Sequence, residues 1–194
     1  DAGILTIVAD GTSIVLYEDF EQDLGDFLSI NVASDRDWRW ASFGGNGFAE
    51  MSGFGADAAS DDWLVSPEVD LSGANSPVLE FQTARDFTGP ALAVLISTDF
   101  NGINPSAATW VALSATLAAD DSDYTITDSG PVDLSAYVGE TVHIAFQYTS
   151  NGGGSGEGAT DQVHDFLITD TGAPFTPDWY DLDVVGSTYL YSEA

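Results

Sequence analysis

Aromatic and basic side chains gather in one short segment of the sequence. Arg36, Trp38, Arg39 and Trp40 lie within five residues, Phe43 follows them, and two of the chain's three basic residues belong to this set. Exposed aromatic rings can stack on sugar rings, and guanidinium groups donate paired hydrogen bonds to oxygen acceptors. The pattern predicts a ligand-binding surface for a glycan, including an anionic one. The alternative is that both tryptophans face a core while both arginines pair with nearby aspartates.

Residues with catalytic potential are sparse. His143 and His164 have no partner that their spacing suggests, and Ser155 lies in Gly-Gly-Ser-Gly-Glu, which differs from the nucleophile motif Gly-x-Ser-x-Gly. The sequence contains no His-Glu-x-x-His motif, phosphate-binding loop or dinucleotide fingerprint. We therefore expect a protein that is not an enzyme. The alternative is a carbohydrate-active enzyme that uses two carboxylates in a cleft.

Acidic residues dominate the charge of the chain. It has 32 acidic residues against three basic ones, for a formal net charge of −29, although only 18% of its residues are charged. Such a surface attracts cations and repels nucleic acids and anionic lipids. This composition is typical of a protein in salty water and indicates a marine or halophilic bacterium.

Length and composition indicate a folded, secreted domain. The chain has 194 residues, 44% of them apolar and 12% aromatic, which is sufficient for a large core. It has no cysteine, so it forms no disulfide, and no apolar run approaches the roughly 20 residues of a membrane span. Because the chain starts at Asp1 without an initiator methionine, we expect a processed, extracellular or cell-surface protein without direct membrane insertion.

Apolar residues recur with a period of two, which predicts an all-β fold. Short segments with this pattern are separated by Gly, Pro, Asn and Asp. They are residues 4–8, 13–17, 38–43, 49–52, 62–66, 78–84, 91–97, 110–113, 124–127, 141–149, 163–169 and 187–191. One short helical turn is expected over residues 134–138. Many short strands at this spacing predict a β-sandwich or jelly roll.

An ordered series of sequence blocks resembles the cleaved-adhesin or choice-of-anchor-J domain family of secreted bacterial proteins. The blocks are YEDFEQDLGDF from Tyr17, DDWLVSPEVDL from Asp61, VLEF from Val78, LAVLISTDFNG from Leu92, WVAL from Trp110, VDLSAYVGETVHIAF from Val132 and VHDFLI from Val163. The resemblance implies a jelly-roll β-sandwich of two antiparallel sheets. It also implies adhesion, or binding of glycans or surface proteins, often with calcium.

The resemblance suggests where a calcium ion would bind. In a jelly roll of this family an ion can be held between the first and last strands, and Ca²⁺ prefers six to eight oxygen ligands. Glu18 and Glu21 on the opening strand and Asp165 on the closing strand are then the expected ligands of a structural Ca²⁺. The chain departs from the family at residues 33–38, where two glycines of an ion-binding loop are replaced and Arg36 is present. The alternative is that the three carboxylates are ordinary surface groups.

These observations predict three parts and a function. Residues 1–16 form an N-terminal strand or hairpin extension, residues 17–172 the jelly-roll domain, and residues 173–194 a C-terminal tail that packs on the domain or on a neighbour. The predicted function is a non-catalytic extracellular binding or adhesion module that recognises a glycan or a surface protein. The alternative is a subunit of an extracellular filament or surface layer that self-associates through its terminal strands.

Overall fold

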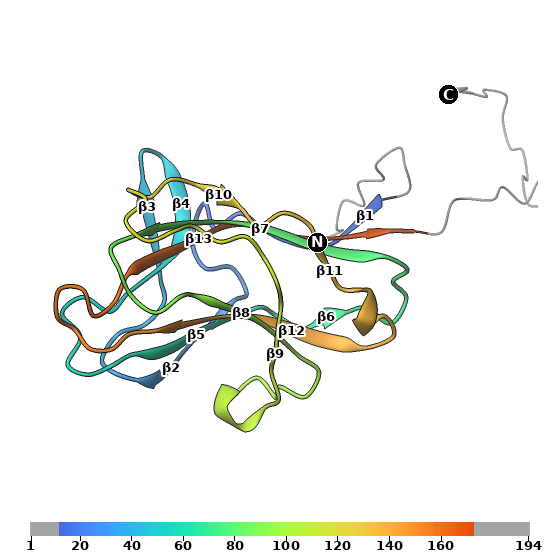
Figure 1. The fold of residues 1–194 in the computed structure, drawn as a ribbon. Coiled ribbons are helices and arrows are strands. Elements are labelled where there is room, and N and C mark those ends of the chain that lie inside the picture. The colour runs from blue at the N-terminus through green and yellow to red at the C-terminus, as the bar shows by residue number, and fades with distance from the viewer. Residues whose placement is uncertain (1–11, 173–194) are drawn as a thin grey trace, which may run out of the picture.

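The computed structural model describes residues 12–172 of the chain, and the strands there form two stacked antiparallel sheets (Figure 1). The seven-stranded sheet has the order β10-β7-β13-β4-β3, with β1 also on β13 and β11 also on β7. Its strands are β1 (Thr12–Glu18), β3 (Arg39–Phe43), β4 (Asn46–Ser52), β7 (Pro77–Asp86), β10 (Thr127–Asp128), β11 (Val132–Asp133) and β13 (Thr160–Thr171).

The six-stranded sheet has the order β2-β5-β12-β8-β9, with β6 also on β12. Its strands are β2 (Leu28–Ala33), β5 (Asp61–Val65), β6 (Val69–Asp70), β8 (Ala93–Ser97), β9 (Val111–Ala112) and β12 (Thr141–Thr149). The predicted all-β jelly-roll sandwich of two antiparallel sheets is confirmed. The helices of the described residues are two single 3-10 turns, Pro105–Ala107 and Ser135–Tyr137, and neither is long enough to cross a membrane.

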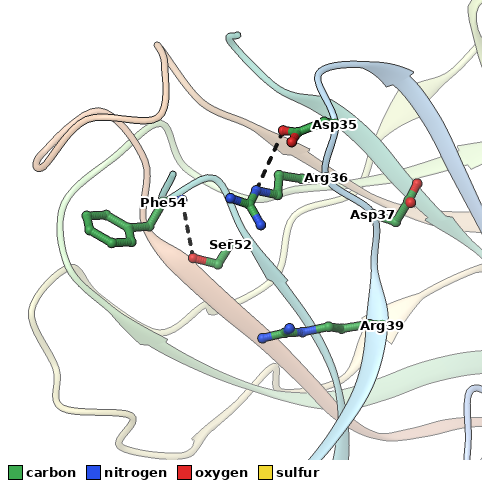
Figure 2. A pocket seen from close by; sticks show the side chains of 6 residues that line it. All are labelled: Asp35, Arg36, Asp37, Arg39, Ser52 and Phe54. Atoms are coloured by element: carbon green, nitrogen blue, oxygen red, sulfur yellow. Dashed lines mark hydrogen bonds and ion pairs between the residues drawn. The ribbon is translucent and has the colours of Figure 1, made fainter. Parts of the chain in front are cut away.

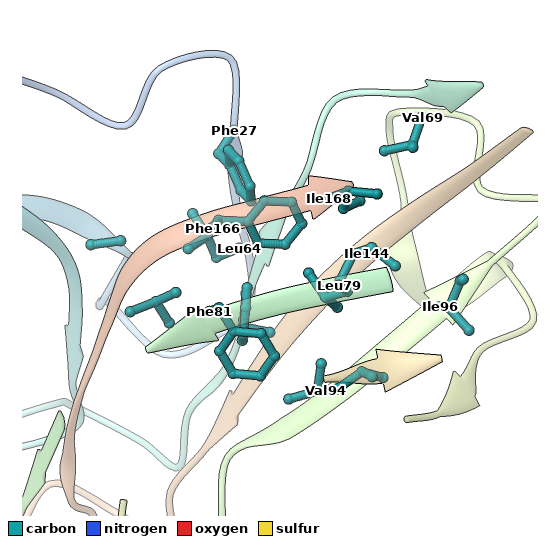
Figure 3. Packing of buried hydrophobic residues seen from close by; sticks show 14 of the residues in the cluster. Phe27, Leu64, Val69, Leu79, Phe81, Val94, Ile96, Ile144, Phe166 and Ile168 are labelled. Atoms are coloured by element: carbon teal, nitrogen blue, oxygen red, sulfur yellow. The ribbon is translucent and has the colours of Figure 1, made fainter. Parts of the chain in front are cut away.

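The core lies between the sheets because alternate residues of each strand point inward. Figure 3 shows Leu79 and Phe81 of β7 beside Phe166 of β13 and Ile144 of β12, and all four are buried. Aromatic rings meet edge to face in this core, and the ring centroids of Phe81 and Phe146 are 5.0 Å apart. Burial of these large side chains is the main stabilising term of such a sandwich.

The long central strand β13 connects two regions of its sheet. Its first half pairs with β4, and its second half pairs with β1. The register with β7 shifts between His164 and Leu167, and Asp165 has a left-handed φ of 43°. This bulge turns Phe166 into the core. At the far end Thr12 pairs with Thr171, so both ends of the described chain lie side by side.

Local differences from the sequence prediction have identifiable causes. The strand expected over residues 124–127 forms only from Thr127, because Asp123 and Tyr124 have left-handed φ angles of 48° and 52°. Strand β2 was not predicted, although Leu28, Ile30 and Val32 alternate with polar or small residues. The segments predicted over residues 4–8 and 187–191 lie outside the described residues.

Candidate functional site

A pocket of about 430 Å³ opens at one end of the sandwich. Its lining comes from the β2–β3 loop, the first residue of β3, the last residue of β4 and the turn after β4. The lining residues are Asp35, Arg36, Asp37, Arg39, Ser52 and Phe54. Figure 2 shows both guanidinium groups pointing to the side of the pocket where Ser52 and Phe54 lie, while Asp37 points away. The structure thus brings the predicted Arg36 and Arg39 together in one concave site.

Local hydrogen bonds fix the β2–β3 loop that carries this pocket. Ser34 has a left-handed φ of 86°, and its hydroxyl accepts a hydrogen bond from the backbone N–H of Arg36 at 3.1 Å. The Asn31 side chain donates to the backbone carbonyls of Ser34 and Arg36. Asp35 Oδ1 accepts from the backbone N–H of Asp57 at 3.0 Å. Because short polar side chains satisfy the backbone, the loop holds its arginine without a helix or strand.

Both pocket arginines are held by partners and still face solvent. Arg36 Nη2 donates to the carbonyl of Gly55 at 2.6 Å, and Arg36 Nε lies 3.7 Å from Asp35 Oδ1. Arg39 Nη2 lies 2.7 Å from Glu50 Oε1, and the Arg39 side chain is 69% exposed. Each guanidinium therefore keeps donors that a ligand can reach.

The third arginine is inaccessible. Arg85 is 3% exposed, and all of its nitrogens donate to Asp161, Asp120 and the carbonyls of Gly89 and Pro90. Burial raises the pKa of Asp161 to about 6, although Arg85 lowers it. Since the chain has three basic residues, both that face solvent line the same pocket. The pocket is therefore the one place where the surface presents lysine or arginine charge.

The prediction for Trp38 requires a correction. Its side chain is only 2% exposed, packs in the main core and donates from Nε1 to the backbone carbonyl of Asp62 at 3.2 Å. An indole buried in this way cannot stack on a sugar. Trp40 is 40% exposed but lies outside the pocket lining, and its Nε1 donates to the carbonyl of Phe20 at 2.8 Å. The Trp38 indole thus holds strand β5 through Asp62, and the Trp40 indole holds the segment after β1 through Phe20.

The accessible aromatic ring of the pocket is Phe54, which the sequence analysis missed. Its side chain is 67% exposed at the turn after β4, and Gly53 and Gly55 flank it. Single exposed aromatic residues are common on protein surfaces, so its place in the pocket lining makes Phe54 a candidate contact, not its exposure. An aromatic residue between two glycines was the available signal, because glycines mark a turn that presents the residue between them.

The three predicted calcium ligands lie at the end of β1 (Glu18), in the segment after it (Glu21) and in the β13 bulge (Asp165). Glu18 Oε1 accepts from the backbone N–H of Phe20 at 2.9 Å, and Glu21 Oε2 accepts from the N–H of Gly47 at 3.1 Å. Within residues 12–172, no group of three or more His, Asp or Glu side chains is arranged to hold a metal ion. Each of Glu18 and Glu21 thus accepts one backbone hydrogen bond and keeps a second carboxylate oxygen.

One carboxylate on strand β5, next to the edge strand β2, is buried. Asp62 is fully buried, and neither of its carboxylate oxygens has a hydrogen-bond partner among the described residues. Burial and the nearby carboxylate of Asp37 together raise the pKa of Asp62 to about 7, although the Ser60 side chain lowers it. The charge state of Asp62 therefore changes near neutral pH.

The two histidines serve in packing. His143 stacks edge to face on Phe100, and its Nδ1 lies 3.0 Å from the carbonyl of Ser66. His164 contacts the ring of Phe48, and burial lowers the pKa of His164. Neither imidazole is paired with a hydroxyl nucleophile in the described interactions.

Comparison with known proteins agrees with this architecture. A family model described as a domain of unknown function (DUF5017) matches residues 68–175. The K1 cleaved adhesin domain of Lys-gingipain from Porphyromonas gingivalis is similar in structure, with a TM-score of 0.57 and 19% identity over 83% of this chain and 99% of that domain. The K3 domain of the same protein has a TM-score of 0.57 and 19% identity over 81% of this chain and 100% of that domain. No curated protein matches the sequence. The predicted resemblance to cleaved-adhesin domains is confirmed, and at this identity it concerns the fold.

Proposed function

Because the chain belongs to the family described as a domain of unknown function (DUF5017), we propose a function from its own surface: a non-catalytic extracellular module that binds a glycan at the pocket of Arg36 and Arg39. The observation that carries the proposal is the convergence of both solvent-facing basic residues on one pocket. A protein with a net charge of −29 gains little from two arginines that only pair with its own acids. A ligand with a negatively charged oxygen group can accept hydrogen bonds from both arginines.

The overall charge narrows the class of glycan. A dense polyanion is repelled by the surrounding acidic surface, whereas a neutral chain gains nothing from the two guanidinium groups. The best match is a mainly neutral glycan with occasional carboxylate or sulfate groups. One such group can lie between Arg36 and Arg39 and accept charge-assisted hydrogen bonds.

The rest of the pocket suits sugar hydroxyls and sugar faces. Asp35 and Ser52 offer acceptors for hydroxyl donors, and the exposed ring of Phe54 can stack on the apolar face of a sugar. The neighbours Gly53 and Gly55 leave the ring accessible. Cleaved-adhesin domains share the fold, and their name describes adhesion, which agrees with a binding role at the cell surface.

The experiment compares acidic and neutral glycans of matched length. Isothermal titration with a glucuronoxylan oligosaccharide and with the uronate-free xylan oligosaccharide should show tighter binding of the acidic member. The Arg36→Gln, Arg39→Gln double variant should lose at least about tenfold in affinity, which equals about 1.4 kcal/mol. Phe54→Ala should weaken binding of both members.

A matched control uses another exposed phenylalanine. Phe43 is 84% exposed but does not line the pocket, so Phe43→Ala should bind as the parent does. An array of acidic and neutral glycans on which the protein stays silent would overturn the proposal. Binding to a surface protein that survives loss of both arginines would assign the module to a protein partner instead.

We keep calcium binding as a separate proposal, supported by the excess of acidic residues. A structural ion would raise the melting temperature in millimolar calcium relative to a chelator, because a ligand that binds only the folded state stabilises it. Glu21→Gln should reduce that increase if the ion lies between the first and last strands. A melting temperature that is the same in calcium and in chelator would contradict the proposal that the protein binds calcium.

A further inference from the structure

Strand β2 is an edge of the six-stranded sheet, and its first four residues carry none of the usual blocking features. Within residues 12–172 it pairs only with β5. Its sequence, Leu-Ser-Ile-Asn-Val-Ala, contains no charged residue, proline or glycine. Leu28 and Val32 are each 40% exposed. Edge strands are normally blocked by charge, proline, a bulge or short length, because a free row of N–H and C=O groups recruits another strand.

The other edges of the described sandwich are better blocked. Strands β9 and β10 have two residues each. Strand β3 begins at the charged Arg39. Strand β1 has a register shift between Ile14 and Leu16, in the middle of its length. The shift in β2 lies between Asn31 and Ala33, which leaves the ladder regular over its first four residues.

The apolar face beside β2 continues into a small secondary core. Ile30 packs against a cluster on the outer face of the six-stranded sheet that includes Trp63 and Trp110. The rings of Trp63 and Trp110 lie 5.1 Å apart. A strand added next to β2 would extend this cluster and cover Leu28 and Val32, so burial of apolar surface would add to the backbone hydrogen bonds.

The sequence supplies a donor segment outside the described residues. Residues 4–8 read Ile-Leu-Thr-Ile-Val, an uncharged run with high β-propensity. A strand formed by this segment beside β2 would place two aliphatic side chains on the side of Leu28 and Ile30 in either facing, Leu5 and Ile7 or Ile4 and Val8. The segment precedes Thr12, and Figure 1 shows the start of β1 and strand β2 at opposite ends of the sandwich.

We propose that residues 4–8 of one copy add as a strand to the β2 edge of a second copy, so that copies assemble head to tail. Donor and acceptor differ and lie at opposite ends, so the contact is heterologous and produces an open chain rather than a closed dimer. The assembly goes beyond glycan binding and uses none of the residues that line the Arg36–Arg39 pocket. An open chain of binding modules would gain avidity for a repetitive glycan.

Charge makes this assembly dependent on salt. Each copy carries a net charge of −29, so copies repel one another at low ionic strength. At about 1 M salt the Debye length falls to roughly 3 Å, and the repulsion is screened. The inference therefore predicts that oligomer size increases with NaCl concentration, the reverse of an assembly held by ion pairs.

The test measures the mass of the full chain by light scattering after size exclusion, from about 0.05 M to about 2 M NaCl. Oligomers should grow with salt, and Leu28→Lys should return them to monomers because it places a charge on the acceptor edge. Ile7→Asp should do the same from the donor side. Val32→Lys provides a second acceptor variant in case Leu28→Lys fails to fold, as judged by circular dichroism.

Phe43→Lys is the matched control, since it places the same charge on the exposed end of the other sheet's edge strand β3. It should leave assembly unchanged. A monomer at every salt concentration would overturn the inference, as would oligomers that persist in Leu28→Lys and Val32→Lys or dissolve in Phe43→Lys. Titration of the same variants with the glucuronoxylan oligosaccharide separates this outcome from failure of the proposed function.

Discussion

Arg85 and Asp161 form a buried ion pair in which Nη1 lies 2.8 and 2.9 Å from the two carboxylate oxygens. The two side chains are 4% and 3% exposed. They join neighbouring strands β7 and β13 on the inward side of the seven-stranded sheet. Because Arg85 is the charge partner of the buried Asp161, this arginine lies in the interior and not at the surface.

Removing this arginine should be strongly destabilising. Arg85→Gln leaves Asp161 buried without its charge partner, which costs about 3–5 kcal/mol of unfolding free energy. The loss should be larger at about pH 8 than at about pH 5, where the isolated carboxyl can take up a proton. Urea unfolding at both pH values measures it. Arg39→Gln, at an exposed pair, should cost less than about 1 kcal/mol, and equal losses for both variants would contradict the assignment.

Asp62 should make stability fall as pH rises toward neutrality. Its pKa is raised from 3.8 to about 7, so the folded state binds the proton more tightly than the unfolded chain does. The stabilisation is complete below about pH 4 and is lost as pH rises through about 7. Asp62→Asn should remove this dependence and exceed the parent by roughly 2–4 kcal/mol above neutral pH.

Thermal unfolding of parent and Asp62→Asn across this pH range tests the sign. Asp133→Asn is the control, because hydrogen bonds from Ser135 lower the pKa of that exposed carboxyl. A parent that becomes more stable relative to Asp62→Asn as pH rises would show that the buried carboxylate has a partner in solution, such as a cation.

The Tyr148 hydroxyl should position the turn that carries Phe54. It accepts from the N–H of Gly53 at 2.8 Å and donates to the carbonyl of Ala159 at 2.6 Å, in a buried environment. Tyr148→Phe leaves both backbone groups unsatisfied and should cost about 1–3 kcal/mol. Urea unfolding checks this, with the exposed Tyr17→Phe as a control near zero. If Tyr148→Phe lost as little unfolding free energy as Tyr17→Phe, a water molecule would be satisfying the two backbone groups in place of the Tyr148 hydroxyl.

Gly55 should be required for the pocket rather than for the fold. It has a φ of 73°, and a Cβ there would lie 2.9 Å from Arg36 Nη2. Gly55→Ala should weaken binding of the acidic oligosaccharide because it displaces that guanidinium. Gly102→Ala is matched in backbone strain, with a φ of 79° and no atom within 4 Å of a Cβ, so both should lose about 1 kcal/mol of stability. Equal affinity in the two variants would contradict the role of Arg36.

The strands that sequence reasoning predicted best are those whose pattern is local. The segment over residues 141–149 coincides with β12, because its buried alternation is continuous. The strand β2 was missed although Leu28, Ile30 and Val32 alternate, since no family block marks it. Tyr124 was wrongly placed in a strand. The β-branched residues that follow it favour a strand, and the sequence carries no sign of its left-handed φ.

Only half of the pocket was predicted, although its lining comes from one hairpin and the loop before it. Arg36 and Arg39 were identified from their rarity in an acidic chain. Trp38 was assigned to the same surface, but it lies just before β3 and its ring is buried in the core. Phe54 joins the site through the β3–β4 hairpin, whose Gly44-Gly45 turn is a hairpin signal that the sequence analysis did not use.

The most direct test of the central claim uses the small number of arginines. With three arginines, the ¹⁵N–¹H spectrum of the uniformly labelled protein has three Nε–Hε signals. Titration with the glucuronoxylan oligosaccharide should shift the signals of Arg36 and Arg39 and leave that of the buried Arg85 in place, whereas the neutral xylan oligosaccharide should shift neither as strongly. Saturable binding that moves no arginine signal, or moves only that of Arg85, would contradict the account.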